Sequence, residues 1–335
     1  MQARQGLSAQ KSVPLQSIMR IVQFLKTWTL PVAMGTGALL YALFALTPCL
    51  DAAGDRLAPW FDTLLPTFMF LVLFVTFCKV DFHKMRPVWW HLWVSLLNVL
   101  FVGVITALIV GFRLKGDTLV LMESLLMCVI APCATAAAVV TQKLGGSLEE
   151  ITTYTFISNF VCAALVPLCF PMVEQQADVP FWAAFCRILY QVVAVLVMPM
   201  LLAYVVKHRL KRFHRWVVSI RDLSFYLWSC SLMIVTGVTV RNIVHAQASS
   251  LLLAAIAILG LVVCVVQFSV GRYVGRRCGR EMEAGQALGQ KNTAFAIWMA
   301  YAFLTPLSSV GPGCYILWQN IINSAEIWRK MKDER

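Results

Sequence analysis

One lysine interrupts an apolar stretch near the C-terminal end of the chain. Lys291 lies in the segment Ala-Leu-Gly-Gln-Lys-Asn-Thr, residues 287–293, between an amphipathic run and the apolar run 294–300. A charge inside a membrane is costly, so an ionisable residue there indicates a functional site. The alternative is that its ammonium donates to carbonyls freed by a helix break and only holds the helices together.

The composition is that of a membrane protein with several spans. Of the 335 residues, 60% are hydrophobic and 13% are charged, and the mean hydropathy is +0.75. Apolar runs of about 20 residues can each cross the bilayer as a helix. The sequence predicts ten such spans, at residues 28–48, 60–79, 88–112, 118–143, 149–173, 181–206, 221–243, 249–273, 282–303 and 308–328.

The basic residues predict the orientation of these spans. Most of the 28 Lys and Arg lie in the tail 1–27, in the connector 207–221 and in other segments on the same side as the two termini. By the positive-inside rule, both termini are expected in the cytoplasm, with the chain in the plasma (inner) membrane. This distribution accounts for the net charge of +12 without nucleic acid as a partner.

Two predicted spans carry a helix break. The connector 207–221 divides the ten spans into halves of five, and an odd number per half predicts an inverted repeat. Pro132 interrupts the fourth span of the first half, and Gly289 interrupts the fourth span of the second. Matched breaks indicate a transport site near the midplane. Each would present a helix N-terminus there, and with Lys291 nearby these ends favour an organic anion.

These features resemble the bile acid:sodium symporter family over nearly the whole chain. The likeness is most specific at residues 132–144, in the Thr-rich span ending at Pro167, in the segment 289–292 and at the Trp-Gln-Asn segment 318–320. It implies an all-α protein in which broken fourth and ninth spans cross. It also implies a panel domain at 28–79 and 181–243 and a core domain at 88–173 and 249–328, with substrate bound between the two domains and carried by alternating access. The charge distribution predicts cytoplasmic tails at 1–27 and 329–335.

The sodium-binding residues implied by the resemblance are largely missing. A family Glu corresponds to Ala287 and a family Gln to Lys291, and the positions of other sodium ligands fall on Ala137, Ala138 and Ile151. The family Thr is kept as Thr155, and a third-span Gln has its nearest counterpart in Asn98, one residue out of register. We therefore expect Lys291 to replace bound sodium, which makes sodium coupling doubtful and implies no other cofactor or metal.

Further polar residues are candidates to bind substrate or an ion. Thr135, Gln290, Asn292 and Thr293 lie beside the breaks, and Thr155, Ser158 and Asn159 share one face of a predicted helix. The competing interpretations are hydrogen bonding of Thr to its own helix and packing between helices.

Several functional alternatives stay open. Transport could be facilitative, proton-coupled through Lys291, or sodium-coupled through the remaining oxygens, and a sensor without transport is a competing class. An enzyme is not expected, because the chain has no His-Glu-x-x-His, Gly-x-Gly-Asp or nucleotide-binding loop. The expected partners are a small organic anion and the lipid bilayer. The identity of the anion, the direction of transport and the oligomeric state do not follow from the sequence.

Overall fold

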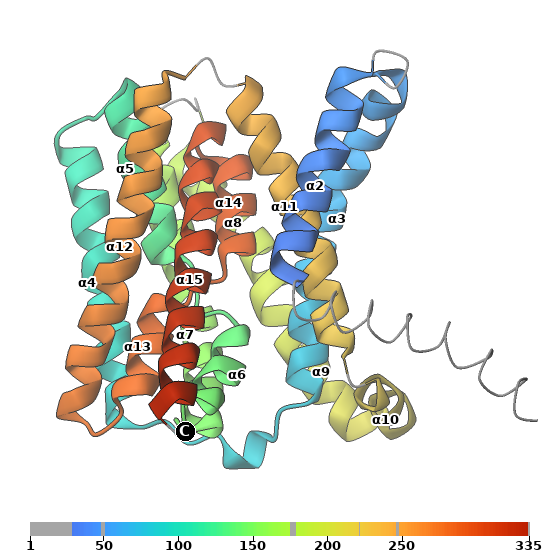
Figure 1. Ribbon diagram of the computed structural model, residues 1–335, viewed down its shortest axis with the longest axis vertical. Coiled ribbons are helices and arrows are strands. Elements are labelled where there is room, and N and C mark those ends of the chain that lie inside the picture. The colour runs from blue at the N-terminus through green and yellow to red at the C-terminus, as the bar shows by residue number, and fades with distance from the viewer. Residues whose placement is uncertain (1–28, 48–50, 175–178, 221, 246–247, 334–335) are drawn as a thin grey trace, which may run out of the picture.

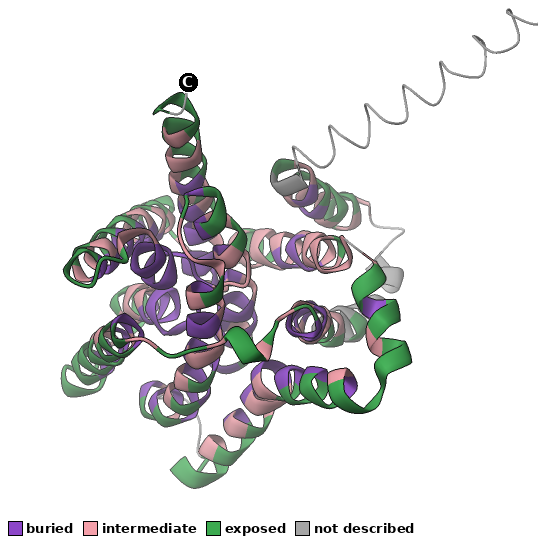
Figure 2. Cartoon of the chain, turned by 90° about the horizontal axis from the view of Figure 1, so that it is seen from below, coloured by how far each residue is buried: buried purple, intermediate pink, exposed green. Residues whose placement is uncertain are grey.

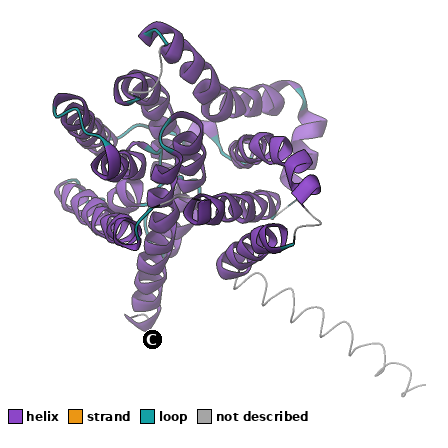
Figure 3. Ribbon diagram, turned by 90° about the horizontal axis from the view of Figure 1, so that it is seen from above, coloured by secondary structure: helices purple, strands orange, loops and turns teal. Residues whose placement is uncertain are grey.

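The computed structural model describes residues 29–47, 51–174, 179–220, 222–245 and 248–333. The basic tail 1–27 therefore lies outside the described residues. The part of the chain that is described is helical apart from its connecting segments (Figure 3). Its only β-type pairing is one isolated bridge between Cys133 and Lys291. The predicted all-α class is confirmed for these residues.

Five described helices are long and apolar enough to cross a membrane. By length and composition, these helices are typical of a membrane protein with several spans. They are α4 (Trp89–Gly111), α7 (Leu148–Val173), Phe181–Arg209, α11 (Leu223–His245) and α12 (Ser250–Arg277). Beside them stand α2 (Thr29–Leu46) and α3 (Asp51–Cys78), which contain the shorter apolar stretches Pro31–Leu46 and Thr63–Cys78. The total of ten spans remains a prediction.

Both predicted breaks divide a span into two helices. The segment predicted at 118–143 consists of α5 (Gly116–Ile130) and α6 (Ala136–Lys143). The segment predicted at 282–303 consists of α13 (Glu281–Gly289) and α14 (Thr293–Phe303). Each half is too short to cross a bilayer alone, which is why neither pair is among the five long apolar helices.

The helices pack in two groups (Figure 1). In one, α12 packs along α13 and α15 (Val310–Asp333), and α4 contacts α5 and α7. In the other, α11 packs along α2 and α3. Buried residues concentrate within the first group (Figure 2). The groups include the elements expected for the core and panel domains, although their division into moving bodies stays a prediction.

Several boundaries differ from those expected. The sixth predicted span consists of α8 (Phe181–Val192), a π-helical turn η3 (Val193–Val197) and α9 (Met198–Arg209), and Pro199, which has no N–H to donate, follows this turn. α12 and α15 continue past the predicted ends at 273 and 328, because residues such as Arg276 and Lys330 have a high propensity for helix. The expected tail 329–335 is thus helical as far as Asp333.

The predicted connector 207–221 also contains a helix, α10 (Lys211–Ser219). It lies across the end of the bundle where the C-terminus is found, as Figures 1 and 2 show from two directions. A shorter 3₁₀ turn, η2 (Phe82–Lys84), follows α3 at the same end.

Candidate functional site

The two helix breaks cross and hold each other through their backbones. The N–H of Ala134 donates to the carbonyl of Gln290 at 2.9 Å, and the N–H of Asn292 donates to the carbonyl of Pro132 at 2.8 Å. Cys133 and Lys291 face each other in this antiparallel bridge. The extended backbone that each break exposes is therefore paired with the other break instead of with water.

Each break also frees helical carbonyls, and side chains bond to them. Pro132 has no N–H, so the carbonyl of Cys128 lacks its helical donor and accepts instead from Nε2 of Gln267 at 3.1 Å. On the other break, the carbonyl of Gly289 accepts from the hydroxyl of Tyr315 at 2.6 Å. Gln267 also donates to this hydroxyl at 3.0 Å, which links the two breaks.

The ammonium of Lys291 bonds to a third freed carbonyl. The N–H of Cys133 donates to Oγ of Ser158 at 3.0 Å, which leaves the carbonyl of Val129 without its helical partner. Nζ of Lys291 donates to that carbonyl at 2.7 Å and to Oδ1 of Asn98 at 2.9 Å. Lys291 is only 3% exposed, so its side chain is directed into the protein and lies at the crossing, as the sequence predicts.

The backbone of Lys291 is fixed by one side chain of α15. Gln319 accepts from the N–H of Lys291 at 3.0 Å and donates to its carbonyl at 3.3 Å. A single amide thus satisfies both polar backbone groups of this residue, which restricts where its side chain can reach.

The ammonium has no acidic partner in the part of the chain that the structure describes. Ion pairs of the described residues join Arg or Lys side chains to acids such as Asp81, Glu150 and Glu326, and Lys291 takes part in none of them. Both acceptors of Nζ are neutral oxygens, which solvate a cation without neutralising it.

The positions that the resemblance assigns to sodium ligands come together, but their side chains are apolar. Ala137, Ile151 and Ala287 are buried in one hydrophobic cluster with Trp90 and Tyr154. Ala138 packs against the same cluster. At the positions where the resemblance implies oxygen ligands for sodium, this chain therefore has packed apolar side chains beside the crossing.

The remaining candidates on α7 bond mainly within the protein. The hydroxyl of Thr155 donates to the carbonyl of Ile151 at 2.9 Å, and the amide of Asn159 donates to the carbonyl of Thr155 at 3.0 Å. Both bonds lie within α7, so these two side chains bond to their own helix, which is the alternative to binding a ligand. Oδ1 of Asn159 is buried and has no hydrogen-bond partner among the described residues.

The candidates beside the second break have different roles. Oδ1 of Asn292 accepts from the N–H of Phe295 at 3.3 Å and so caps α14. The N–H of Thr293 donates to the carbonyl of Lys291 at 2.9 Å. Oε1 of Gln290 is buried and has no hydrogen-bond partner within the described ranges. A ligand that donates a hydrogen bond would satisfy this oxygen.

A cavity of about 330 Å³ leads toward the crossing from the end that carries α10. It lies between the α3 to η2 segment on one side and α6 and α7 on the other, and Thr135 and Thr155 both line it. Lys79 and Lys84 of the α3 to η2 segment also line it. The structure therefore separates two sets of candidates: Thr135 and Thr155 reach this cavity, whereas Lys291 and Asn98 face the protein interior.

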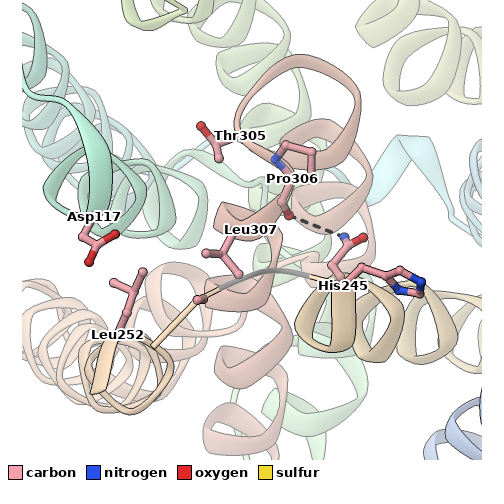
Figure 4. A pocket seen from close by; sticks show the side chains of 8 residues that line it. Asp117, His245, Leu252, Thr305, Pro306 and Leu307 are labelled. Carbon is pink, nitrogen blue, oxygen red and sulfur yellow. Dashed lines mark hydrogen bonds between the residues drawn. The ribbon is translucent and has the colours of Figure 1, made fainter. Parts of the chain in front are cut away.

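A second cavity, of about 370 Å³, is lined by residues of α5, α11, α12 and η4 (Pro306–Ser309) (Figure 4). Asp117, His245 and Thr305 are among its lining residues, and the amide of Asn242 donates to the carbonyl of Pro306 at 3.4 Å. None of its lining residues belongs to the crossing.

Sequence reasoning missed two residues of the crossing, Gln267 and Tyr315. Gln267 is the one amide in the otherwise apolar run 250–270, so its isolation could have drawn attention to it. Tyr315 carries no comparable signal. Lys291 also donates to the backbone carbonyl of Val129, and a backbone acceptor cannot be predicted from the type of side chain at that position.

Comparison with known proteins identifies the family. No curated protein has a sequence that matches this chain. The sequence profile of the sodium bile acid symporter family matches residues 66–271. This range is more than half of the chain and contains the first break, while the second break and Lys291 lie beyond it. The chain thus belongs to the sodium bile acid symporter family.

Proposed function

We propose that this protein carries an organic anion across the membrane without sodium, and that Lys291 supplies the positive charge that sodium provides in other members of the family. Family membership indicates a transporter with a small solute as substrate. The observation that carries the finer proposal is the ammonium of Lys291, buried at the crossing of two helix breaks with neutral acceptors only.

Electrostatics favours replacement of sodium over coexistence with it. A cation about 4 Å from the ammonium would be repelled by roughly 4 kcal/mol at an effective dielectric constant of about 20. Sodium also needs several oxygen ligands, whereas Ala137, Ile151 and Ala287 offer packed hydrocarbon. Both effects disfavour a bound sodium ion at these positions.

A purely structural role for Lys291 does not require its charge. The carbonyl of Cys128, freed by the same break, is satisfied by the neutral amide of Gln267. A glutamine at position 291 could serve the carbonyl of Val129 in the same way. The cost of burying an ammonium is therefore unexplained unless its charge is used.

The expected substrate position is the cavity beside the crossing. Its lining includes the hydroxyl-bearing residues Thr135 and Thr155 and the basic residues Lys79 and Lys84, groups suited to an anion. The N-terminal ends of α6 and α14 start next to the crossing, and their dipoles add positive potential there. Lys291 would act on the anion through this field, since its ammonium is directed into the protein.

The remaining parts of the proposal follow the family resemblance. They are ten spans in two inverted repeats and a core domain that moves past a panel domain. The protein would lie in the plasma membrane with both termini in the cytoplasm, and it would have no enzymatic activity. With this orientation, the cavity at the α10 end would open to the cytoplasm.

The proposal is tested first without knowledge of the substrate. The purified protein in detergent is titrated with NaCl and, at equal ionic strength, with KCl, and its unfolding temperature is measured. We expect the two salts to give the same curve. A saturable stabilisation by sodium alone would refute sodium independence while leaving the family assignment intact.

Transport itself is tested once a ligand is found. Carboxylates, sulfates and phosphates are screened for stabilisation of the purified protein, and uptake of the best ligand into proteoliposomes is measured with and without sodium and pH gradients. We expect uptake that no sodium gradient accelerates. Acceleration by a pH gradient would favour proton coupling through Lys291, and binding without uptake would favour a sensor.

A further inference from the structure

The short helix α10 connects two long apolar helices and lies at a membrane surface. α9 precedes it and α11 follows it, and both belong to segments long and apolar enough to cross the bilayer. A short connector between two spans has to lie where the bilayer meets water. Figures 1 and 2 show α10 lying across the end of the bundle.

The residues of α10 separate into an apolar and a basic side. At about 100° per residue, Phe213 and Val217 fall on one side of the helix, with Trp216 at its edge, and the basic residues fall on the other. Leu210, which directly precedes the helix, adds an apolar side chain at its start. Those basic residues are Lys211, Arg212 and Arg215, all of them exposed. This arrangement is typical of a helix that lies in the membrane interface.

The apolar side is only partly used inside the protein. Phe213 stacks on Phe74 of α3 with ring centroids 6.4 Å apart, and Val217 is buried. Trp216 nevertheless leaves 59% of its surface exposed, and Leu210 leaves 54%. A largely exposed tryptophan at this level is the residue type that anchors proteins at the headgroup region.

The basic side has no acidic partner within the described residues. No ion pair there involves Arg209, Lys211, Arg212 or Arg215. The sequence from 198 to 221 contains no Asp or Glu at all. A cluster of unneutralised cations beside exposed apolar rings matches the chemistry of an anionic phospholipid, whose headgroup is negative and whose acyl chain is apolar.

We propose that α10 is a docking site for anionic phospholipids. Its basic side contacts the phosphate headgroups, and Trp216 and Leu210 contact the acyl region just beneath them. This inference is independent of the proposed substrate and of Lys291.

The site is connected to the wall of the cavity near the crossing. Nε2 of His214 donates to the carbonyl of Cys78 at 2.8 Å, and Nζ of Lys79 donates to the carbonyl of Ile220 at 3.2 Å. Nζ of Lys207, just before α10, donates to the carbonyl of Val80 at 2.9 Å. Lys79 and Val80 line the cavity, so a lipid that immobilises α10 also restrains this wall.

Lipid retention tests the docking site. The purified protein is incubated with equal amounts of phosphatidylglycerol and phosphatidylcholine, and retained lipid is measured by native mass spectrometry. We expect the wild type to prefer phosphatidylglycerol by about tenfold or more, since each basic residue near a surface adds to the attraction. The triple variant Lys211→Gln, Arg212→Gln, Arg215→Gln is expected to lose most of this preference.

A matched variant removes the same charge elsewhere at this end. Arg277→Gln, Arg329→Gln, Lys332→Gln neutralises three exposed basic residues on α12 and α15. It is expected to keep the wild-type preference. Equal losses in both triple variants, or no preference in the wild type, would overturn the proposal.

Hydrogen exchange provides a test that requires only the wild-type chain. In nanodiscs containing phosphatidylglycerol, amides of residues 79–86 and 211–219 are expected to exchange more slowly than in phosphatidylcholine nanodiscs. If soluble glycerol phosphate produces the same slowing in phosphatidylcholine nanodiscs, the site binds a free phosphate and the lipid proposal fails. Unchanged exchange in both segments would also refute it.

Discussion

The ammonium of Lys291 lies 2.9 Å from Oδ1 of Asn98, although the two residues are 193 positions apart in the sequence. With the carbonyl of Val129, this amide forms a neutral acceptor set for a buried cation. The pair joins α4 to the crossing of the two breaks. Because neither acceptor carries a charge, the positive potential of the ammonium persists in the surrounding protein.

The Asn98 side chain therefore permits a direct test of the role of charge. Asn98→Asp keeps the size of the side chain and places a carboxylate against the ammonium, which would pair with it. We expect the unfolding temperature to be maintained, while stabilisation by organic anions is lost, because the local positive charge is cancelled. Isothermal titration with the best anion found in the screen measures the change in affinity.

The control for this substitution is Asn159→Asp on α7. It adds a buried carboxylate at a residue that makes no hydrogen bond with the ammonium of Lys291, and the Asn159 amide that it replaces bonds within its own helix. If both variants keep full anion affinity, the charge of Lys291 does not contribute to binding.

Two substitutions at position 291 separate charge from hydrogen bonding. Lys291→Met removes the donor and leaves the carbonyl of Val129 buried and unpaired, which costs about 1–3 kcal/mol of unfolding free energy. Lys291→Gln keeps a donor and is expected to cost less. Both remove the charge, so both should abolish anion binding. Unfolding in detergent measures stability, and titration calorimetry measures affinity; a Gln variant that binds anions normally would contradict the proposed role.

The sodium site offers a test by reconstruction. The double variant Ala287→Glu, Lys291→Gln restores at two positions the residue types implied by the family resemblance. It removes the repelling ammonium and adds a carboxylate, so we expect stabilisation by sodium over potassium that the wild type lacks. The single variant Ala287→Glu is the control, because its carboxylate would face the ammonium instead of a metal ion. Equal responses of the double variant to both salts would show that the other missing oxygens, at Ala137, Ala138 and Ile151, are also required.

The sequence was sufficient to predict the crossing but not its contacts. Pro132 and Gly289 indicated both breaks because proline and glycine disturb a helix in any context, and the charge of Lys291 in an apolar run indicated a special position. The acceptor at Val129 and the role of Gln319 depend on which carbonyls a break leaves free and on how distant helices pack. The helix α10 was missed because its many basic residues suggested a loop, whereas their spacing around a helix, beside Phe213 and Trp216, was the informative feature.

Gly289 provides a last prediction, on the stability of the second break. A Cβ at this position would collide with the ring of Phe268 on α12, which lies directly over the glycine. The ring is buried and cannot move away without disturbing neighbours, so we expect Gly289→Ala to lower the unfolding free energy by about 1–3 kcal/mol. Gly103→Ala on α4 is the matched control, since nothing lies within 4 Å of its new Cβ, and alanine there is expected to stabilise the helix by about 0.5–1 kcal/mol. Thermal unfolding in the same detergent compares the two variants. If Gly289→Ala unfolds at the temperature of the wild type, the close packing of α12 over the break is not a constraint on the crossing.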